Sequence, residues 1–279
     1  MTTLVTGARG RVGRTLIDLL HERGLPVRAA SKAPEELQLP DGVGAVACSL
    51  GDPGTFAAAL EGVRSVFLYA EPEHIDAFLA AAGEAGVAHI VLLSSSSVLM
   101  PGAATHPIAG PHWAVERALA AAPVTATVLR PGHFATNALG WAHALRTSGV
   151  LRVPYPEAHT DPIHERDIAE AALAALIEPG KAGGTHTLTG PESLSFREQV
   201  ERIGRAAGRP LTVQRISEEE WKRETAAYIP GHLADALLGV WADSDGREAE
   251  IADGVRELTG RPARSFSQWA QDHAADFAA

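Results

Sequence analysis

Lysine, cysteine and long apolar runs are scarce in this sequence, and each scarcity excludes a class of protein or a kind of site. Of the 24 basic residues only three are lysines, Lys32, Lys181 and Lys222, and the rest are arginines. The single cysteine, Cys48, cannot form an internal disulfide, and a lone thiol is typical of a reducing compartment. No stretch holds 18 consecutive apolar residues, and the first residues lack the basic and apolar regions of a secretory signal. We therefore expect a cytoplasmic protein without a membrane partner.

Positive charge is also in short supply. The 34 acidic residues exceed the 24 basic ones, which gives a formal net charge of -10 at pH 7. Nucleic acids attract positively charged surfaces, so we expect no nucleic-acid partner. The chain has 279 residues, 46% of them hydrophobic, which is enough to bury a substantial core. We expect a folded protein that acts on a small-molecule substrate, with a homodimer left open.

Short apolar runs alternate with longer helical patterns up to about residue 130. The expected strands are 3–6, 26–30, 44–48, 65–69, 89–93 and 125–129, and the expected helices are 11–22, 53–60, 72–85 and 111–121. This alternation is typical of βαβ units with right-handed crossovers, which build a parallel sheet. The predicted fold class is α/β, a Rossmann-type doubly wound parallel sheet of six strands.

The pattern changes after Arg130, where strands become sparse and helix signals take over. Three segments have the Ser-x-x-Glu/Gln spacing of a capping box, in which two side chains satisfy free N–H groups of a first helical turn. They begin at Ser195, Ser217 and Ser265. Another helix is expected over 167–177. We therefore expect a sheet domain over 1–130 and a smaller, mainly helical lobe over 131–279 that packs on it and forms a cleft with it.

A glycine-rich loop, Thr-Gly-Ala-Arg-Gly-Arg-Val-Gly over 6–13, stands between the first expected strand and the first expected helix. At this place free N–H groups and the positive end of a helix dipole bind the pyrophosphate of a dinucleotide. The first glycine allows the tight turn, the second lets the backbone approach the phosphates, and the third lets helix and strand pack closely. The predicted cofactor contacts here are Gly7, Arg9, Gly10, Arg11, Val12 and Gly13.

The end of the second expected strand distinguishes NADP(H) from NAD(H). An acidic residue there, about 20 residues after the loop, would hold a free ribose hydroxyl and exclude a phosphate. This sequence has Ser31 and Lys32 instead. A hydroxyl and a cation favour NADP(H) over NAD(H), with Lys32 pairing with the 2′-phosphate. The alternative is that Lys32 only begins an exposed helix.

Five segments together resemble the atypical short-chain dehydrogenase/reductases, specifically the NmrA-like branch with its NAD(P)H:quinone reductases and redox-sensing regulators. The segments are the glycine loop, Ile-Val-Leu-Leu-Ser-Ser from 90, Val-Leu-Arg-Pro-Gly-His-Phe from 128, Pro-Ile-His-Glu-Arg-Asp-Ile-Ala from 162 and Leu-Thr-Gly-Pro-Glu-Ser-Leu-Ser from 188. The resemblance covers almost the whole chain. It implies an NAD(P)-binding domain, 1–130, with a substrate lobe, 131–279, over the nicotinamide, and it does not imply one substrate.

This sequence departs from the usual acid relay of short-chain reductases. In that relay a Ser follows the fifth strand, and a Tyr-x-x-x-Lys on the next helix donates the proton and holds the ribose. By position Ser96 resembles the Ser, but His112 and Glu116 stand where Tyr and Lys are expected. Either His112 donates the proton, with Glu116 raising its pKa, or the acceptor needs no strong enzymic acid and the protein chiefly positions its ligands.

The resemblance also places weaker candidates around the nicotinamide and the adenine. The further cofactor candidates are Ser49, Tyr69, Ala70 and Pro131, and the substrate candidates are His133, Phe134, Trp113 and Trp141. The aromatic residues either form a wall for a planar acceptor or pack the join between the two lobes. The 12 histidines are scattered without a paired Cys-x-x-Cys, so we expect no metal.

These observations leave three functions open. The first is an NADPH-dependent oxidoreductase that passes a hydride to a small quinone, carbonyl or imine acceptor without the Tyr-x-x-x-Lys relay. The second is a redox-sensing regulator that binds NAD(P) without turnover. The third is a biosynthetic isomerase or cyclase on the same fold.

Overall fold

Seven parallel strands form the central sheet of the structure, a computed structural model that describes residues 2–278. The strands are β1 (Thr2–Val5), β2 (Val27–Ser31), β3 (Gly44–Ala47), β4 (Val63–Tyr69), β5 (His89–Leu93), β6 (Thr125–Pro131) and β9 (Thr185–Leu188). Their order across the sheet is β3-β2-β1-β4-β5-β6-β9, and every neighbouring pair is parallel. The order reverses direction beside β1, as in a doubly wound fold, so the predicted fold class is confirmed.

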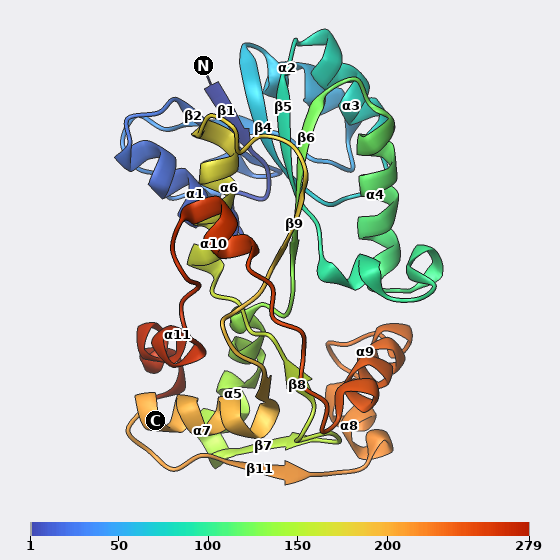
Figure 1. The fold of residues 1–279 in the computed structure, drawn as a ribbon, viewed down its shortest axis with the longest axis vertical. Helices are drawn as coiled ribbons and strands as arrows, with labels where there is room; N and C mark the ends of the chain where they lie inside the picture. Colours follow the sequence, from blue (N-terminus) through green and yellow to red (C-terminus); the bar gives the residue numbers. More distant parts are fainter. Residues whose placement is uncertain (1, 279) are drawn as a thin grey trace.

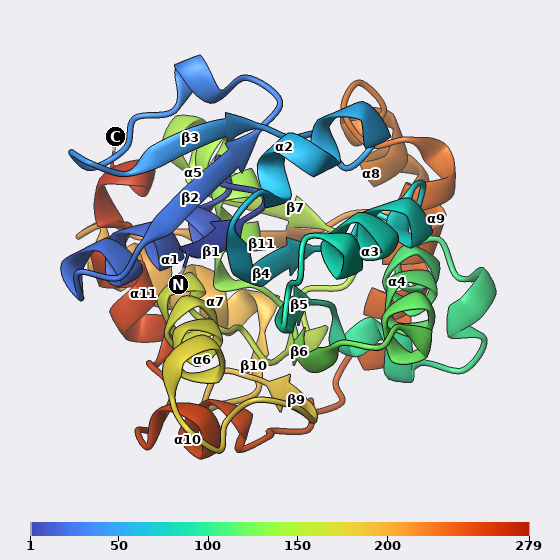
Figure 2. The same ribbon diagram turned by 90° about the horizontal axis from the view of Figure 1, so that it is seen from above.

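Helices cover both faces of this sheet, because its central strands are apolar on both sides (Figure 2). On one face lie α1 (Arg11–Glu22) and α6 (Glu165–Ile177), with α10 (Gly254–Thr259) beside α6. On the other lie α2 (Phe56–Leu60), α3 (Ile75–Glu84) and α4 (Ala109–Ala121). Within residues 2–278, no helix combines the length and the apolar character that a bilayer crossing requires.

A second, smaller part lies below the sheet in Figure 1. Its elements are α5 (Ala142–Ser148), β7 (Val150–Val153), β8 (His159–Thr160), β10 (Leu194–Ser195), α7 (Phe196–Ala206), β11 (Thr212–Arg215), α8 (Glu218–Thr225), α9 (Gly231–Ser244) and α11 (Phe266–Asp272). β7 pairs with β11 and β8 pairs with β10, so this lobe is helical with two small sheets. The side chains of Ser195, Ser217 and Ser265 each cap a helix as predicted, but of the three only Ser195 forms the full capping box, with Glu198.

Short 3₁₀ helices fill several of the connections. They are η1 (Pro34–Glu36), η2 (Pro53–Thr55), η3 (Ser96–Leu99), η4 (Ala103–Thr105), η5 (Ala135–Trp141) and η6 (Ala274–Phe277). The two that matter for the site are η3, which follows β5, and η5, which follows β6. Both therefore begin at the carboxyl edge of the sheet.

The chain crosses between the two parts more than once. It leaves the sheet after β6, returns for α6 and β9, and returns again for α10 before ending in the lobe (Figure 1). The expected boundary at residues 130 and 131 lies at the first of these crossings. The sequence predicted a sheet of six strands, and the seventh, β9, is a correction: its residues Thr-His-Thr-Leu are too polar to stand out as an apolar run.

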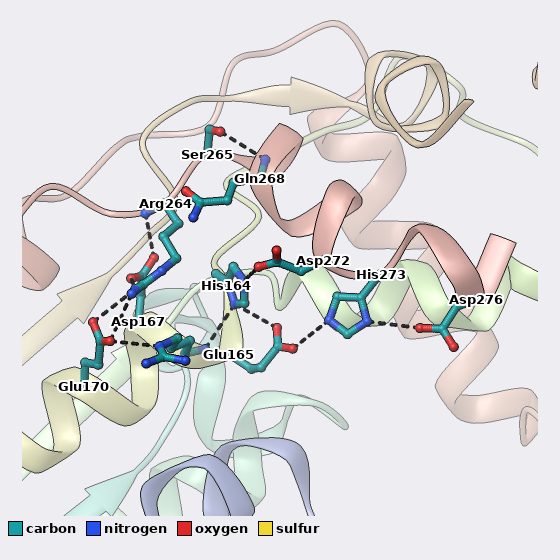
Figure 3. Close-up of polar contacts among 11 residues, drawn as sticks. His164, Glu165, Asp167, Glu170, Arg264, Ser265, Gln268, Asp272, His273 and Asp276 are labelled. Carbon is teal, nitrogen blue, oxygen red and sulfur yellow. Dashed lines mark hydrogen bonds and ion pairs between the residues drawn. The ribbon is translucent and has the colours of Figure 1, made fainter. Parts of the chain in front are cut away.

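An ionic cluster ties the C-terminal segment to the N-terminus of α6 (Figure 3). His164 is the N-cap of α6, and its Nε2 lies 3.2 Å from the Asp272 carboxylate at the end of α11. The Glu165 carboxylate lies 2.8 Å from Nε2 of His273. Close by, Arg264 pairs with Asp167 and Glu170. These contacts hold the end of the chain beside the join of the two parts.

Candidate functional site

The glycine loop between β1 and α1 has the geometry of a phosphate cradle. Gly7 has φ of 65°, and the N–H of Gly10 donates to its carbonyl at 2.8 Å, which closes the tight turn. A Cβ added at Gly13 would lie 2.5 Å from the Gly7 carbonyl oxygen, so only glycine fits there without moving the loop. Gly10 is the N-cap of α1, and no side chain of the described residues caps this helix. Free N–H groups and the helix dipole therefore meet at a place that a dinucleotide pyrophosphate fits.

The other predicted loop residues divide between charge and packing. Val12 is buried in the core under the loop, whereas Arg9 and Arg11 are exposed. Nη1 of Arg9 lies 3.0 Å from a carboxylate oxygen of Glu36 in η1. This contact brings Arg9 next to the segment that follows β2.

The end of β2 presents the residues expected beside an adenosine 2′ position. Ser31 is buried and its Oγ accepts the N–H of Ala33 at 3.1 Å, which leaves the hydroxyl proton for another partner. Lys32 follows it with an exposed side chain. Together with Arg9, it puts two cations around one turn, with the Glu36 carboxylate as the competing charge.

The ends of β3 and β4 form the next part of the same edge. The Tyr69 ring is 52% exposed and lies against Gly7, where an added Cβ would be 3.5 Å from its Cδ2. Its N–H donates to Oγ1 of Thr6 at 2.7 Å, so β4 is bonded to the start of the loop. Ala70 is buried, and Ser49 is half-buried in a turn whose backbone N–H donates to Thr55. The structure thus brings these three predicted residues to the edge of the sheet that carries the loop.

A cavity of about 970 Å³ lies where the carboxyl ends of β5, β6 and β9 meet the lobe. The sheet side of the cavity is lined by Ser95, Ser96, Gly132, His133, Thr187 and Thr189. Two of the predicted residues, Ser96 and His133, are among them. Pro131 is the last residue of β6 and fixes the strand end from which this wall begins.

The lobe side of the cavity is an aromatic wall. Trp141 contacts Phe196 with ring centroids 5.4 Å apart, Phe196 contacts Trp241 at 5.3 Å, and Trp241 contacts Trp221 at 5.0 Å, all edge to face. Trp141 was predicted for this role and the other three were not. Phe196 follows the Ser195 cap, and Trp221 and Trp241 lie on two later helices. The local sequence therefore indicates that these residues are helical, but it does not indicate that they line the cavity.

Glu116 is held by residues other than His112. Its carboxylate accepts the Ser94 hydroxyl at 2.5 Å and both the Nε and an Nη of Arg130, at 3.0 and 2.6 Å. Nδ1 of His112 is buried and has no hydrogen-bond partner among the described residues. Burial lowers the pKa of His112, and the charge of Glu116 offsets part of that effect. The expected rise in the pKa of His112 from Glu116 is therefore outweighed by burial.

The remaining predicted residues lie in different surroundings. His133 is half-buried, burial lowers its pKa to about 4, and its buried Nε2 has no partner within residues 2–278. Phe134 packs against the sheet core. Trp113 is exposed on α4 with the Arg117 guanidinium 5.5 Å from its ring. Phe134, Trp113 and His112 do not belong to the described residues that line the cavity.

Asp161 is a cavity residue that the sequence did not single out. Its Oδ1 accepts the backbone N–H of His133 at 2.8 Å. Burial raises the pKa of its carboxyl to about 6, and the N–H bond from His133 opposes the rise. Asp161 stands directly before the Pro162 segment of the resemblance, but neither its sequence neighbours nor its spacing indicate that it meets the end of β6.

Comparison with known proteins finds relatives over almost the whole chain. The model of the NmrA-like family matches residues 1–242. A (4-alkanoyl-5-oxo-2,5-dihydrofuran-3-yl)methyl phosphate reductase of Streptomyces griseus is 37% identical over 99% of both chains. An NAD(P)H azoreductase of Xenophilus azovorans is 36% identical, also over 99% of both. The structure of a Citrobacter triphenylmethane reductase with NADP(H) superposes with a TM-score of 0.81 at 22% identity, over 98% of this chain and 100% of that one.

Proposed function

The chain belongs to the NmrA-like family and is an NAD(P)H-dependent oxidoreductase of that type, and we propose that it transfers a hydride from NADPH to a small quinone, carbonyl or imine acceptor. The observation that carries the proposal is the cavity of about 970 Å³ at the same sheet edge as the glycine loop. Ligands of open α/β sheets bind at this edge, outside the carboxyl ends of the strands.

The cofactor is assigned to residues that the structure has brought to this edge. The N–H groups at the start of α1 would hold the pyrophosphate, and Gly7, Gly10 and Gly13 leave room for it. Lys32 and Arg9 would meet the 2′-phosphate, and the hydroxyl of Ser31 would donate to it. Bound NADPH supplies the hydride. The preference for NADPH over NADH rests on these two cations.

The acceptor is assigned to the cavity, between the polar strand ends and the aromatic wall. The edge-to-face rings of Trp141, Phe196 and Trp241 give a flat conjugated molecule an apolar surface to pack on. Two relatives support this class, since one is named for an azo acceptor and the other for a ring whose double bond is conjugated to carbonyl groups. Within this cavity the protein excludes water and fixes the distance between donor and acceptor.

The Tyr-x-x-x-Lys relay has no counterpart in this proposal. Glu116, at the Lys position, forms a two-fold ion pair with Arg130 that fastens α4 to β6. Such a pair stabilises the join of helix and strand and leaves no cation for a ribose. His112 is not the proton donor in this proposal, because burial lowers its pKa and so disfavours the charged imidazolium.

The experiment that tests the proposal follows the absorbance of NADPH, and separately of NADH, with a panel of quinones, aldehydes, imines and azo dyes. We expect turnover with at least one conjugated acceptor and a higher kcat/KM with NADPH. Tight binding of NADPH without its oxidation on any acceptor would instead favour a redox-sensing regulator. Conversion of a substrate to an isomer without consumption of NADPH would favour an isomerase or cyclase.

A further inference from the structure

The carboxyl group of Asp161 is placed at the cavity wall by contacts from two strand ends. Its Oδ1 accepts the N–H of His133, just after β6, and its own carbonyl accepts the N–H of Gly190, just after β9, at 3.1 Å. A Cβ added at Gly132 would lie 1.8 Å from Oδ2 of Asp161. The carboxyl group therefore lies directly over a glycine at the end of β6, and any larger residue there would displace it.

Among the described residues, no cation neutralises this carboxyl group. Within residues 2–278 Asp161 takes part in no ion pair, and the nearest cation along β6, Arg130, is bound twice by Glu116. The ring of His133 is neutral, since burial lowers its pKa to about 4. His159, on β8, is hydrogen-bonded to the hydroxyl of Ser193.

These surroundings favour the protonated form of Asp161. Burial raises the pKa of the carboxyl to about 6, so a fraction of the molecules carries the proton at neutral pH. His133 occupies Oδ1, which leaves Oδ2 as the oxygen for that proton. An acid in a ligand cavity with a pKa near the working pH suits proton donation.

We propose that Asp161 is the proton donor of the reduction and supplies what the missing tyrosine would have supplied. This inference rests on the proposed function. Hydride addition brings two electrons and one proton to a neutral quinone, carbonyl or imine and leaves an anion on oxygen or nitrogen. The O–H bond at Oδ2 then breaks, an O–H or N–H bond forms on the product, and the carboxylate regains a proton from water. A cationic acceptor, such as an iminium ion or a triarylmethane dye, becomes neutral with the hydride alone and needs no such proton.

The test compares a neutral quinone with a cationic triarylmethane dye in the wild-type protein and in Asp161→Asn. The substitution keeps the shape and the acceptor for the His133 N–H but removes the acid. We expect the ratio of kcat for the quinone to kcat for the dye to fall about 100-fold, within the range that general acids contribute. The matched control is Glu201→Gln, which alters an exposed carboxylate on α7 that does not line the cavity and should leave the ratio unchanged.

Two further measurements separate proton donation from shaping of the cavity. In the wild-type protein kcat/KM for the quinone should fall as the pH rises above about 6, and deuterated water should slow the reaction. Both effects should disappear in Asp161→Asn and should be absent for the dye. Gly132→Ala, which pushes the carboxyl away, should lower the same ratio.

The outcomes distinguish this inference from the function on which it rests. Equal losses for quinone and dye in Asp161→Asn, with the pH profile retained, would assign Asp161 a purely structural role and overturn the inference alone. Failure of the wild-type protein to reduce either class would overturn the proposed function, and the inference with it. Binding of NADPH to each variant is measured as a check that the variant is still folded.

Discussion

Lys32 is the residue on which the proposed preference for NADP(H) depends. A charged hydrogen bond to a 2′-phosphate contributes roughly 1.5–3 kcal/mol, so Lys32→Ala should weaken NADPH binding about ten- to one-hundredfold. NADH lacks the phosphate and should bind the variant as it binds the wild-type protein. Fluorescence titration with both nucleotides measures this difference.

The control for Lys32 is Arg23→Ala, because Arg23 is an exposed cation at the C-terminal end of α1, opposite the glycine loop. Its loss should leave both affinities unchanged. If Lys32→Ala weakened NADPH and NADH equally, Lys32 would be a surface residue without a role in selecting the cofactor.

Asp161 should reduce stability in the pH range where it is charged. Its folded pKa of about 6 lies above the ordinary value of 3.8, so its contribution is most favourable below pH 4 and is lost as the pH rises through about 6. A shift of this size corresponds to roughly 3 kcal/mol. Asp161→Asn should therefore unfold at nearly the wild-type temperature at pH 4 and at a higher temperature at pH 8. A pH-independent difference in Tm would show that the carboxyl is not perturbed in the folded state.

Single residues of the site differ in how far the sequence identifies them. The glycine loop, Ser31 and Lys32 are contiguous with a strand end, and local pattern places them. Asp161, Phe196 and Trp241 reach the cavity only through pairings between distant segments, such as β8 with β10. The sequence carries no local sign of such contacts, because the residues next to an Asp or a Trp in the sequence do not reveal whether its side chain lines a cavity or faces solvent.

At the scale of elements, α1 and its loop form the most constrained unit. A Cβ at position 13 would lie 2.5 Å from the carbonyl oxygen and 3.0 Å from the carbonyl carbon of Gly7, both of them loop backbone. Gly13→Ala should therefore distort the cradle, lower stability by about 1–3 kcal/mol and weaken NADPH binding at least tenfold. Thermal unfolding and nucleotide titration measure the two effects.

The matched control for this substitution is Gly239→Ala, in the interior of α9, where an added Cβ meets no atom within 4 Å. Alanine is the better helix former by about 1 kcal/mol, so this variant should be slightly stabilised and should bind NADPH normally. Normal NADPH binding by Gly13→Ala would show that the loop accommodates a side chain and would remove the fit on which the cofactor assignment rests.

Elements with strong local signals were predicted from the sequence nearly to the residue. The strand over 89–93 and the helix over 11–22 coincide with β5 and α1, because an apolar run and an amphipathic pattern with clear ends define them. β9 and the short strands of the lobe were missed. They have two to four residues each, and β9 becomes a strand because β6 offers it a free edge.

At the scale of the whole molecule, the two parts enclose the cavity between them, and their attachment decides whether the site persists. The connection after β6 carries Gly132 and His133, and the ionic cluster around Glu165 holds α11 against α6 (Figure 3). The sequence predicted two parts and a cleft, but it did not predict how the end of the chain is fastened. That attachment joins residues about 100 positions apart in the sequence. At such a separation a local sequence pattern does not predict which residues pair.

The pair of Glu165 and His273 gives this attachment a definite pH dependence. The Glu165 carboxylate raises the pKa of His273, with burial opposing. Burial acts against the charged form of Glu165 too, but His164 and His273 outweigh it and hold the pKa of Glu165 well below its usual range. The contribution of His273 is present below about pH 6.5 and is lost as the pH rises through its raised pKa, whereas that of Glu165 is lost in strong acid.

We therefore expect His273→Gln to lower Tm most at and below about pH 6.5, where both partners are charged in the wild-type protein. Loss of a charged hydrogen bond costs roughly 1.5–3 kcal/mol, and the difference in Tm should narrow toward pH 8 as His273 loses its proton. Asp276→Asn is the matched control, because Asp276 contacts the other ring nitrogen of His273 from a half-exposed position and should have a smaller effect. A Tm difference that stays constant from pH 3 to pH 8 would mean that His273 holds α11 by packing against Trp269 and not by charge.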